Sequence, residues 1–191
     1  MKIIFLDIDG VLNGYNNWTI LGWRIVSLLH IKALKKLYRK ITDPCGVHER
    51  KVKRLARIIK ATNAKVVMTS SWKHSWWETP YYIMNNKQKK LTDLFNKYNI
   101  NVIDITPDLL GVGRDEEILT WLSKNEKAVE NFIILDDENS FLTAFYNDIR
   151  FIQTSSAPIS TMIIWQRYEN TGLNNKHVKQ AIQILNNLKG E

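Results

Sequence analysis

The chain begins with MKIIFLDIDGVLNG, residues 1–14, in which a short apolar run ends in two aspartates. Residues 3–6 are β-branched or large and apolar, which is typical of a strand buried on both faces. Asp7 and Asp9 therefore follow the carboxyl end of a predicted strand, and in open α/β sheets ligands bind beyond such ends. Gly10 permits a sharp turn directly after the acids.

Two aspartates at i and i+2 of an extended segment point to the same side, where their charges repel each other. A divalent cation relieves this repulsion, and Mg²⁺ is the usual ion where carboxylates and a phosphate share a site. An Asp-rich turn after a strand would produce a similar pattern, because Asp and Gly are common turn residues. The length and order of DIDGVLN favour the metal site.

The composition is that of a globular protein, with 45% hydrophobic and 24% charged residues. We expect one domain, residues 1–191, with an inserted segment at about 15–47. The first apolar run is too short to span a membrane and is unlike a signal peptide, so we expect a cytoplasmic protein with no membrane partner. The single cysteine, Cys45, excludes an internal disulfide.

The formal net charge is +8, from 27 Lys and Arg against 19 Asp and Glu, and it favours an anionic partner. Nucleic acid and a phosphorylated small molecule both fit this charge. A predicted helix at about 47–62 is rich in Lys and Arg and is a candidate for contact with a nucleic-acid backbone, although such runs are more often solvated faces. Trp18 and Trp23 could stack on a base, but packing within the protein is the better interpretation.

Polar residues also follow a second buried-type strand, predicted at 64–68. Thr69 and Ser70 come directly after it, and a hydroxyl there can hydrogen-bond a phosphoryl oxygen. Arg114 begins a predicted helix that runs to about residue 124. The dipole at a helix N-terminus disfavours a cation unless an anion binds nearby.

A third buried-type strand, predicted at 131–135, ends in Asp136 and Asp137 and so repeats the geometry of the opening stretch. The segment 72–90 mixes basic and aromatic residues and is predicted to be a connection beside the site. Apolar spacing and strand-like runs predict further helices at about 28–38, 88–98 and 174–188, and further strands at 102–105 and 151–154.

The string DIDGVLN resembles the first motif of the HAD (haloacid dehalogenase-like) phosphohydrolases. Thr69, Arg114 and the Asp136-Asp137 pair resemble the second, third and fourth motifs in order. This resemblance implies an α/β, three-layer Rossmann-like fold with a mainly parallel central sheet and a small or absent cap. One subgroup is more closely similar, the HAD domain of Swiss Army Knife RNA repair proteins. The runs that carry this similarity are GRDEEILTWL, FIILDDE, FIQT and TGLNNKHVKQAI. About residues 155–170 depart from the similarity as an insertion.

The resemblance also implies a role for each residue. The first Asp is the nucleophile and the second the general acid/base, which here are Asp7 and Asp9. Mg²⁺ would be held by Asp7, the backbone carbonyl of Asp9, Asp136, and Asp137 directly or through water. The implied phosphate-binding groups are Thr69 with Ser70 as the alternate, Arg114 with Lys73 as the alternate, and the turn at Gly10.

We therefore expect a Mg²⁺-dependent phosphatase that acts through an aspartyl-phosphate intermediate on a nucleic-acid terminal phosphate, in RNA or DNA, or on a nucleotide. A small-molecule phosphomonoesterase is the main alternative. A phosphotransferase or mutase fits the same motifs. A further alternative is a protein without catalytic activity, a nucleic-acid-binding module with a vestigial site. No stable protein partner is inferred from the sequence.

Overall fold

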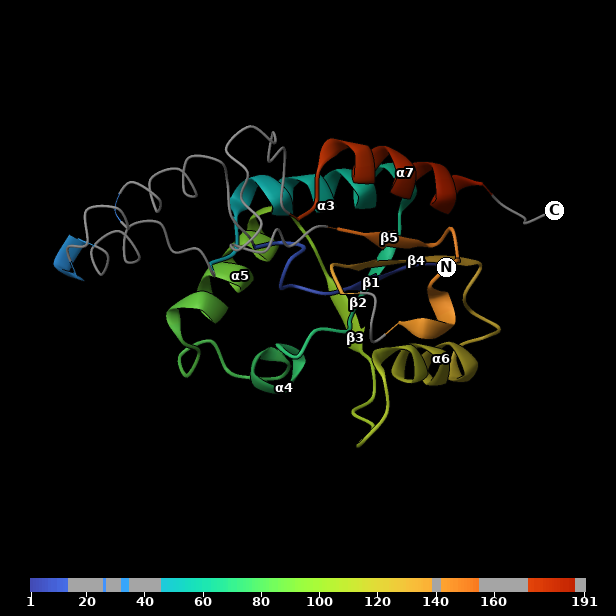
Figure 1. The fold of residues 1–191 in the computed structure, drawn as a ribbon, viewed down its shortest axis with the longest axis horizontal. Helices are drawn as coiled ribbons and strands as arrows, with labels where there is room; N and C mark the ends of the chain where they lie inside the picture. Colours follow the sequence, from blue (N-terminus) through green and yellow to red (C-terminus); the bar gives the residue numbers. More distant parts are fainter. Residues whose placement is uncertain (14–25, 27–31, 35–45, 139–141, 155–171, 188–191) are drawn as a thin grey trace.

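The computed structural model describes residues 1–13, 26, 32–34, 46–138, 142–154 and 172–187. At its centre lies a five-stranded sheet in the order β3-β2-β1-β4-β5, in which every neighbouring pair is parallel (Figure 1). The strands are β1 (Lys2–Leu6), β2 (Lys65–Met68), β3 (Val102–Ile105), β4 (Asn131–Asp136) and β5 (Phe151–Gln153).

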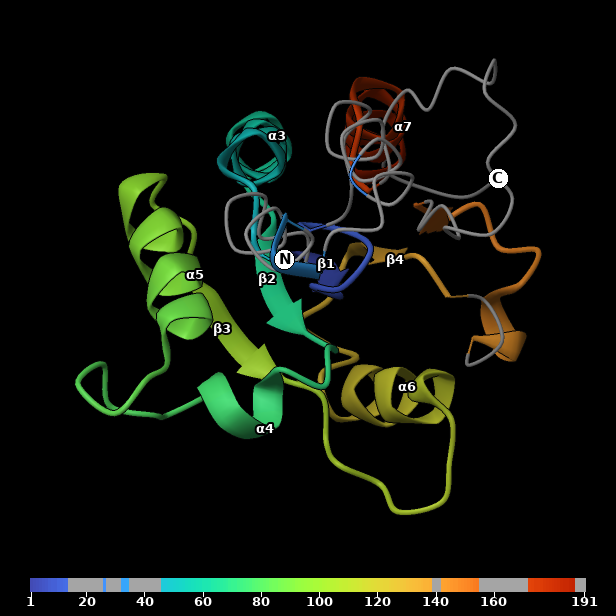
Figure 2. The same ribbon diagram turned by 60° about the vertical axis from the view of Figure 1, so that its left-hand side comes forward.

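Helices cover both faces of this sheet, because the strands carry apolar side chains on both sides. Ile4 and Leu6 of β1 pack into one core with α3 (Glu49–Thr62), α5 (Asn86–Lys97) and α7 (Asn175–Asn186). Ile3 and Phe5 pack into a second core with α6 (Arg114–Lys124) and the short 3-10 helix η1 (Thr143–Phe145). Figure 2 shows α3 and α7 side by side on one face and α6 on the other, which confirms the predicted three-layer α/β fold.

The predicted elements agree closely with the observed ones, and two occupy the predicted residues: β3 at 102–105 and α6 at 114–124. Helix α4 (Lys73–Trp76) was not predicted, because four residues are too few to show a helical period. Residues 32–34 of the predicted helix at 28–38 are helical, whereas the rest of it, most of the segment at about 15–47 and the insertion at about 155–170 lie outside the described residues. None of the helices in the described part of the chain is long and apolar enough to cross a lipid bilayer.

The strand order reverses direction at one place in the sheet, between β1 and β4. From β1 the chain moves outward through β2 and β3, and then returns to form β4 and β5 on the other side of β1. The carboxyl ends of β1 and β4 therefore flank the topological switch point, where ligands bind in open α/β sheets.

Candidate active site

Three aspartates meet at this switch point. Asp7 follows β1, while Asp136 ends β4 and Asp137 comes directly after it. The backbone N–H of Asp7 donates to the carbonyl of Leu135 at 2.9 Å, so the pairing of β1 with β4 continues one residue beyond β1. Each of the three aspartates offers a carboxylate oxygen, and these oxygens lie within 4.8 Å of one another. We call Asp7, Asp136 and Asp137 the acid cluster.

Burial makes this cluster electrostatically costly. Asp7 is 3% exposed and Asp136 is fully buried. Burial, and after it the charge of Asp136, raises the pKa of Asp7 to about 7, although Arg114 and a hydrogen bond from Ser70 act in the opposite direction. Burial also raises the pKa of Asp136. A site that keeps these carboxylates ionised at neutral pH needs additional positive charge.

Arg114 supplies part of that charge. It is the first residue of α6, and its Nη1 lies 3.6 Å from Oδ1 of Asp7 and forms an ion pair with Asp136. Burial alone would lower the pKa of Arg114, but attraction to Asp136 and Asp7 outweighs it and raises the pKa. The carboxylates of Asp7 and Asp136 therefore explain why a cation is stable at this helix N-terminus.

The acid cluster also fits a divalent cation. It offers three carboxylates and no nitrogen or sulfur ligand, and such hard oxygen donors are the ones that Mg²⁺ prefers. The side chain of Asp9 is outside this group, and the predicted contribution of its backbone carbonyl stays a prediction.

The carboxylate of Asp9 is exposed and is held by two side chains. Asn13 Nδ2 donates to its Oδ1 at 2.5 Å, and Trp72 Nε1 donates to its Oδ2 at 3.0 Å. Trp72 comes from the segment after β2, so the orientation of Asp9 depends on two separate parts of the chain. Asp9 stays exposed to solvent while it accepts both hydrogen bonds.

The turn at Gly10 is shaped by close contact with the acid cluster. Gly10 has φ +68°, and a Cβ atom there would lie 2.0 Å from Cγ of Asp137. Its N–H donates to Oδ1 of Asn13 at 2.7 Å, and its carbonyl accepts from Oγ1 of Thr154 at 2.9 Å. A glycine at this position therefore lets the loop after β1 approach the end of β4.

Thr69 and Ser70 lie at the end of β2, next to Asp7. The N–H of Thr69 donates to the carbonyl of Leu6 at 3.0 Å, and Ser70 hydrogen-bonds the Asp7 side chain. Among the described residues, Oγ1 of Thr69 is the one buried side-chain nitrogen or oxygen without a hydrogen-bond partner. Such an atom is costly in a folded protein, and an oxygen-rich ligand would satisfy it.

Lys73 lies in the same region but is already paired. Its Nζ lies 2.7 Å from Oε2 of Glu117 and also donates to Oγ1 of Thr106 and the carbonyl of Pro107, each at 3.1 Å. Both Lys73 and Glu117 border a pocket of about 230 Å³. The residues that line it are Thr69, Ser71, Lys73, His74, Arg114 and Glu117.

The structure thus brings together most of the predicted site residues. Asp7, Asp136, Asp137 and Arg114 form one group, with Gly10, Thr69 and Ser70 against it, and Asp9 is exposed two residues after Asp7. Several residues with contacts at the site were not predicted to act there, among them Asn13, Trp72, Glu117 and Thr154. Asn13, Glu117 and Thr154 lie within runs that carry the family resemblance, whereas no sequence signal links Trp72 to Asp9.

A comparison with known proteins finds a family whose model matches this chain. The model of the family described as "HAD domain in Swiss Army Knife RNA repair proteins" matches residues 3–158, which include every residue of the acid cluster as well as Thr69 and Arg114. No curated protein and no solved structure matches the chain. With the family model covering most of the sequence, the chain belongs to the family of HAD domains found in Swiss Army Knife RNA repair proteins.

Proposed function

We propose that this protein is a Mg²⁺-dependent phosphatase that acts through an aspartyl-phosphate intermediate on the terminal phosphate of a nucleic acid. Membership of the HAD family supports phosphatase-type hydrolase chemistry. The observation that carries the finer proposal is the convergence of the acid cluster and Arg114 on Asp7 at the switch point of the sheet.

In the proposed reaction, a carboxylate oxygen of Asp7 attacks phosphorus and the bond from phosphorus to the leaving oxygen breaks. Asp9 gives its proton to that leaving oxygen. Asp9 then takes a proton from water, whose oxygen attacks the phosphorus of the aspartyl-phosphate. The bond to Asp7 breaks, inorganic phosphate leaves and both carboxyl groups return to their starting states.

The surrounding residues hold the phosphoryl group and balance its charge. The carboxylates of Asp7, Asp136 and Asp137, with the backbone carbonyl of Asp9, would hold Mg²⁺, which neutralises phosphoryl charge and keeps Asp7 ionised. Oγ1 of Thr69 donates to a phosphoryl oxygen, which satisfies its unpaired hydrogen-bonding capacity. Positioning and electrostatics then supply most of the catalysis.

Arg114 is the better candidate than Lys73 for the cation that binds the phosphoryl group. Its Nη1 already lies 3.6 Å from the proposed nucleophile. Lys73 is 4% exposed and its charge is matched by Glu117, so its proposed role is to shape the pocket next to Thr69.

Two observations support a nucleic-acid substrate over a small phosphate ester. The family takes its description from RNA repair proteins, and the chain carries a net charge of +8. RNA and DNA oligonucleotides with a 3′ or 5′ phosphate, assayed beside mononucleotides, separate the two substrate classes. A cytoplasmic location stays a prediction from the sequence.

The test of the chemistry is hydrolysis of p-nitrophenyl phosphate with Mg²⁺ and with EDTA. We expect Asp7→Asn to abolish activity and the wild-type enzyme to give an acid-stable, hydroxylamine-sensitive phosphoenzyme. Asp9→Asn should reduce the rate more for alkyl than for aryl phosphates, because a poor leaving group needs the proton more. Glu126→Gln, which changes an exposed carboxylate after α6, is the matched control and should keep wild-type activity. Unchanged turnover in Asp7→Asn would show that Asp7 is not the nucleophile.

A further inference from the structure

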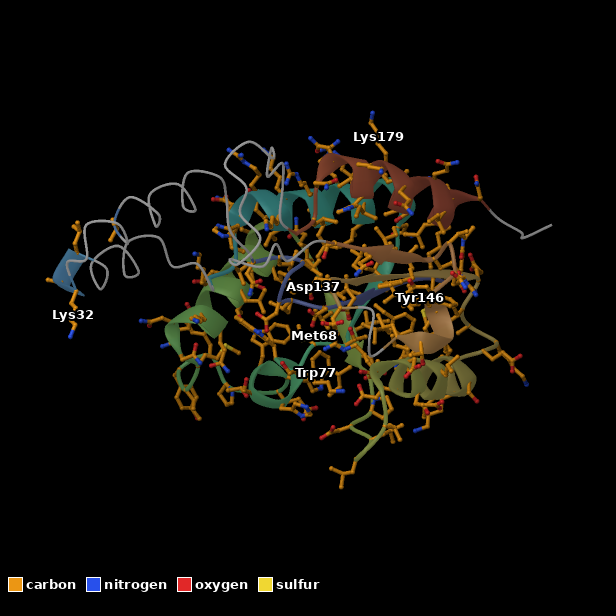
Figure 3. All side chains as sticks on the ribbon, viewed as in Figure 1. Lys32, Met68, Trp77, Asp137, Tyr146 and Lys179 are labelled. Carbon is orange, nitrogen blue, oxygen red and sulfur yellow. The ribbon has the colours of Figure 1, made fainter. Side chains whose placement is uncertain are left out.

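Two adjacent helices carry a concentration of exposed cations. Helices α3 and α7 pack against each other on the same face of the sheet (Figure 1). Figure 3 shows Lys179 extending from α7 away from the sheet. We call the exposed cations of these two helices the α3/α7 basic surface, which consists of Arg50, Lys53, Arg57, Lys60, Lys176 and Lys179.

The cations of α3 lie on one side of the helix. At 3.6 residues per turn, Arg50, Lys53, Arg57 and Lys60 fall within an arc of about 80°, and from Arg50 to Lys60 the axis rises by about 15 Å. Arg57 Nη1 donates to Oδ1 of Asn175 at 3.0 Å, which joins this stripe to the first turn of α7. The two helices therefore form one continuous basic surface.

This surface has almost no acidic counterpart. Helix α7 contains no acidic residue, and the one acid of α3, Glu49, accepts hydrogen bonds from Lys97 at 2.5 Å and Tyr98 at 2.8 Å. None of the six surface cations forms an ion pair with an acid in the described ranges. Burial, with repulsion from Arg50 and Arg57, lowers the pKa of the neighbouring Arg54. An anionic partner would relieve this repulsion.

The surface starts beside the candidate active site. The N–H of His48, just before α3, donates to the carbonyl of Leu12 at 2.9 Å. The N–H of Leu173, just before α7, donates to the carbonyl of Val11, also at 2.9 Å. Leu12 and Val11 belong to the loop that follows Asp9, so both helices begin at the edge of the sheet that holds the acid cluster.

We propose that the α3/α7 basic surface binds the phosphate backbone of a nucleic acid whose end lies at the acid cluster. Each strand of a duplex carries one phosphate per about 3.4 Å of helix axis, so a stripe of about 15 Å faces several of them, whereas a small phosphate ester would need one or two cations. In the described part of the chain, no exposed large apolar side chain lies on α3 or α7, so the surface lacks residues that insert into a lipid layer. Delivery of the end to the site rests on the proposed function, but backbone binding does not.

The test compares two triple variants that remove the same charge. Lys53→Gln/Lys60→Gln/Lys179→Gln changes the basic surface, and Lys65→Gln/Lys124→Gln/Lys127→Gln changes exposed lysines elsewhere. Fluorescence anisotropy measures binding of labelled 12-nucleotide RNA and DNA without a terminal phosphate, in EDTA and across a salt series. Thermal unfolding checks that both variants fold.

We expect the first variant to bind at least tenfold more weakly and to lower the slope of log K against log salt by about 2, because each lost phosphate contact on a single strand removes about 0.7. The second variant should stay within about twofold of wild type. Equal loss in both variants, no nucleic-acid binding by wild type, or binding to phosphatidylserine vesicles in its place would overturn the proposal.

Hydrolysis rates on two substrates test the basic surface separately from the proposed phosphatase function. In the first variant, kcat/KM should fall about tenfold for an end-phosphorylated oligonucleotide and stay unchanged for p-nitrophenyl phosphate. If wild type hydrolyses neither substrate, the proposed function fails while the anisotropy result still decides the binding surface. If the variant loses both activities equally, the proposed delivery of the nucleic-acid end to the acid cluster by this surface is wrong.

Discussion

Replacing Asp7 by Asn should stabilise the metal-free protein at high pH. Burial and the nearby Asp136 raise the pKa of Asp7 from its ordinary value of 3.8 to about 7. Between these values the native state holds a proton that the unfolded chain has released, so the free energy of unfolding falls as the pH rises. A change of about three pH units, at 1.36 kcal/mol each, gives up to about 4 kcal/mol of destabilisation above pH 7.

This cost disappears in Asp7→Asn, because the amide stays neutral. In EDTA at pH 8 the variant should exceed wild type by up to about 4 kcal/mol, or about 8–16 °C in Tm at 2–4 °C per kcal/mol for a chain of this size. At pH 4 the two proteins should have similar stability. Thermal or urea unfolding followed by circular dichroism across pH 4–8 measures the difference.

The same experiment contains its own controls. Glu126→Gln removes an exposed carboxylate and should stay within about 0.5 kcal/mol of wild type throughout. Adding Mg²⁺ at pH 8 should raise the Tm of wild type more than that of Asp7→Asn. A stability difference between Asp7→Asn and wild type that does not change with pH would refute the electrostatic account of the acid cluster.

Three further changes test single contacts at the site. Gly10→Ala should lower kcat on an aryl phosphate at least tenfold and cost about 1–3 kcal/mol of stability, because its Cβ would meet the carboxylate of Asp137 at 2.0 Å. Gly111→Ala is the control: Gly111 has φ +77° but open space around it, so this change should affect stability and leave kcat unchanged. Thr69→Val should reduce kcat about 100-fold, as expected for loss of one donor to the phosphoryl group, and Thr69→Ser should keep most of it. Trp72→Phe should slow alkyl phosphates about tenfold and aryl phosphates less, because it removes the 3.0 Å hydrogen bond to Asp9; equal slowing of both classes would contradict a role in holding that acid.

The sequence was sufficient to predict the acid cluster for a physical reason. Asp7 and Asp136 each follow a run of buried-type residues, and the ends of parallel strands meet at one edge of the sheet. The predicted strand ends therefore place the acids near each other without any knowledge of side-chain positions. The all-parallel sheet then confirms the three-layer fold.

Contacts made by connecting segments could not be predicted in the same way. Trp72 and Asp9 are 63 residues apart, and Lys73 and Glu117 are 44 apart. These pairs depend on the path of the chain after β2, including a four-residue helix that has no periodic signal. The exposure of Lys51 could not be predicted for a related reason. Its place in a basic run predicts an exposed side chain, yet the side chain is 7% exposed and donates to the carbonyl of Asn13 at 2.6 Å.

The distribution of charge around the site gives a reason for the separate basic surface. The acid cluster contributes three carboxylates against the single guanidinium of Arg114, and Glu117 matches the charge of Lys73. When these carboxylates are ionised and no cation is bound, the immediate site therefore repels a phosphate. Positive charge that attracts a long polyanion has to lie outside the site, where it cannot pair with these carboxylates. The α3/α7 basic surface meets that requirement, since both helices begin beside the loop that follows Asp9 and the six cations of the surface are exposed.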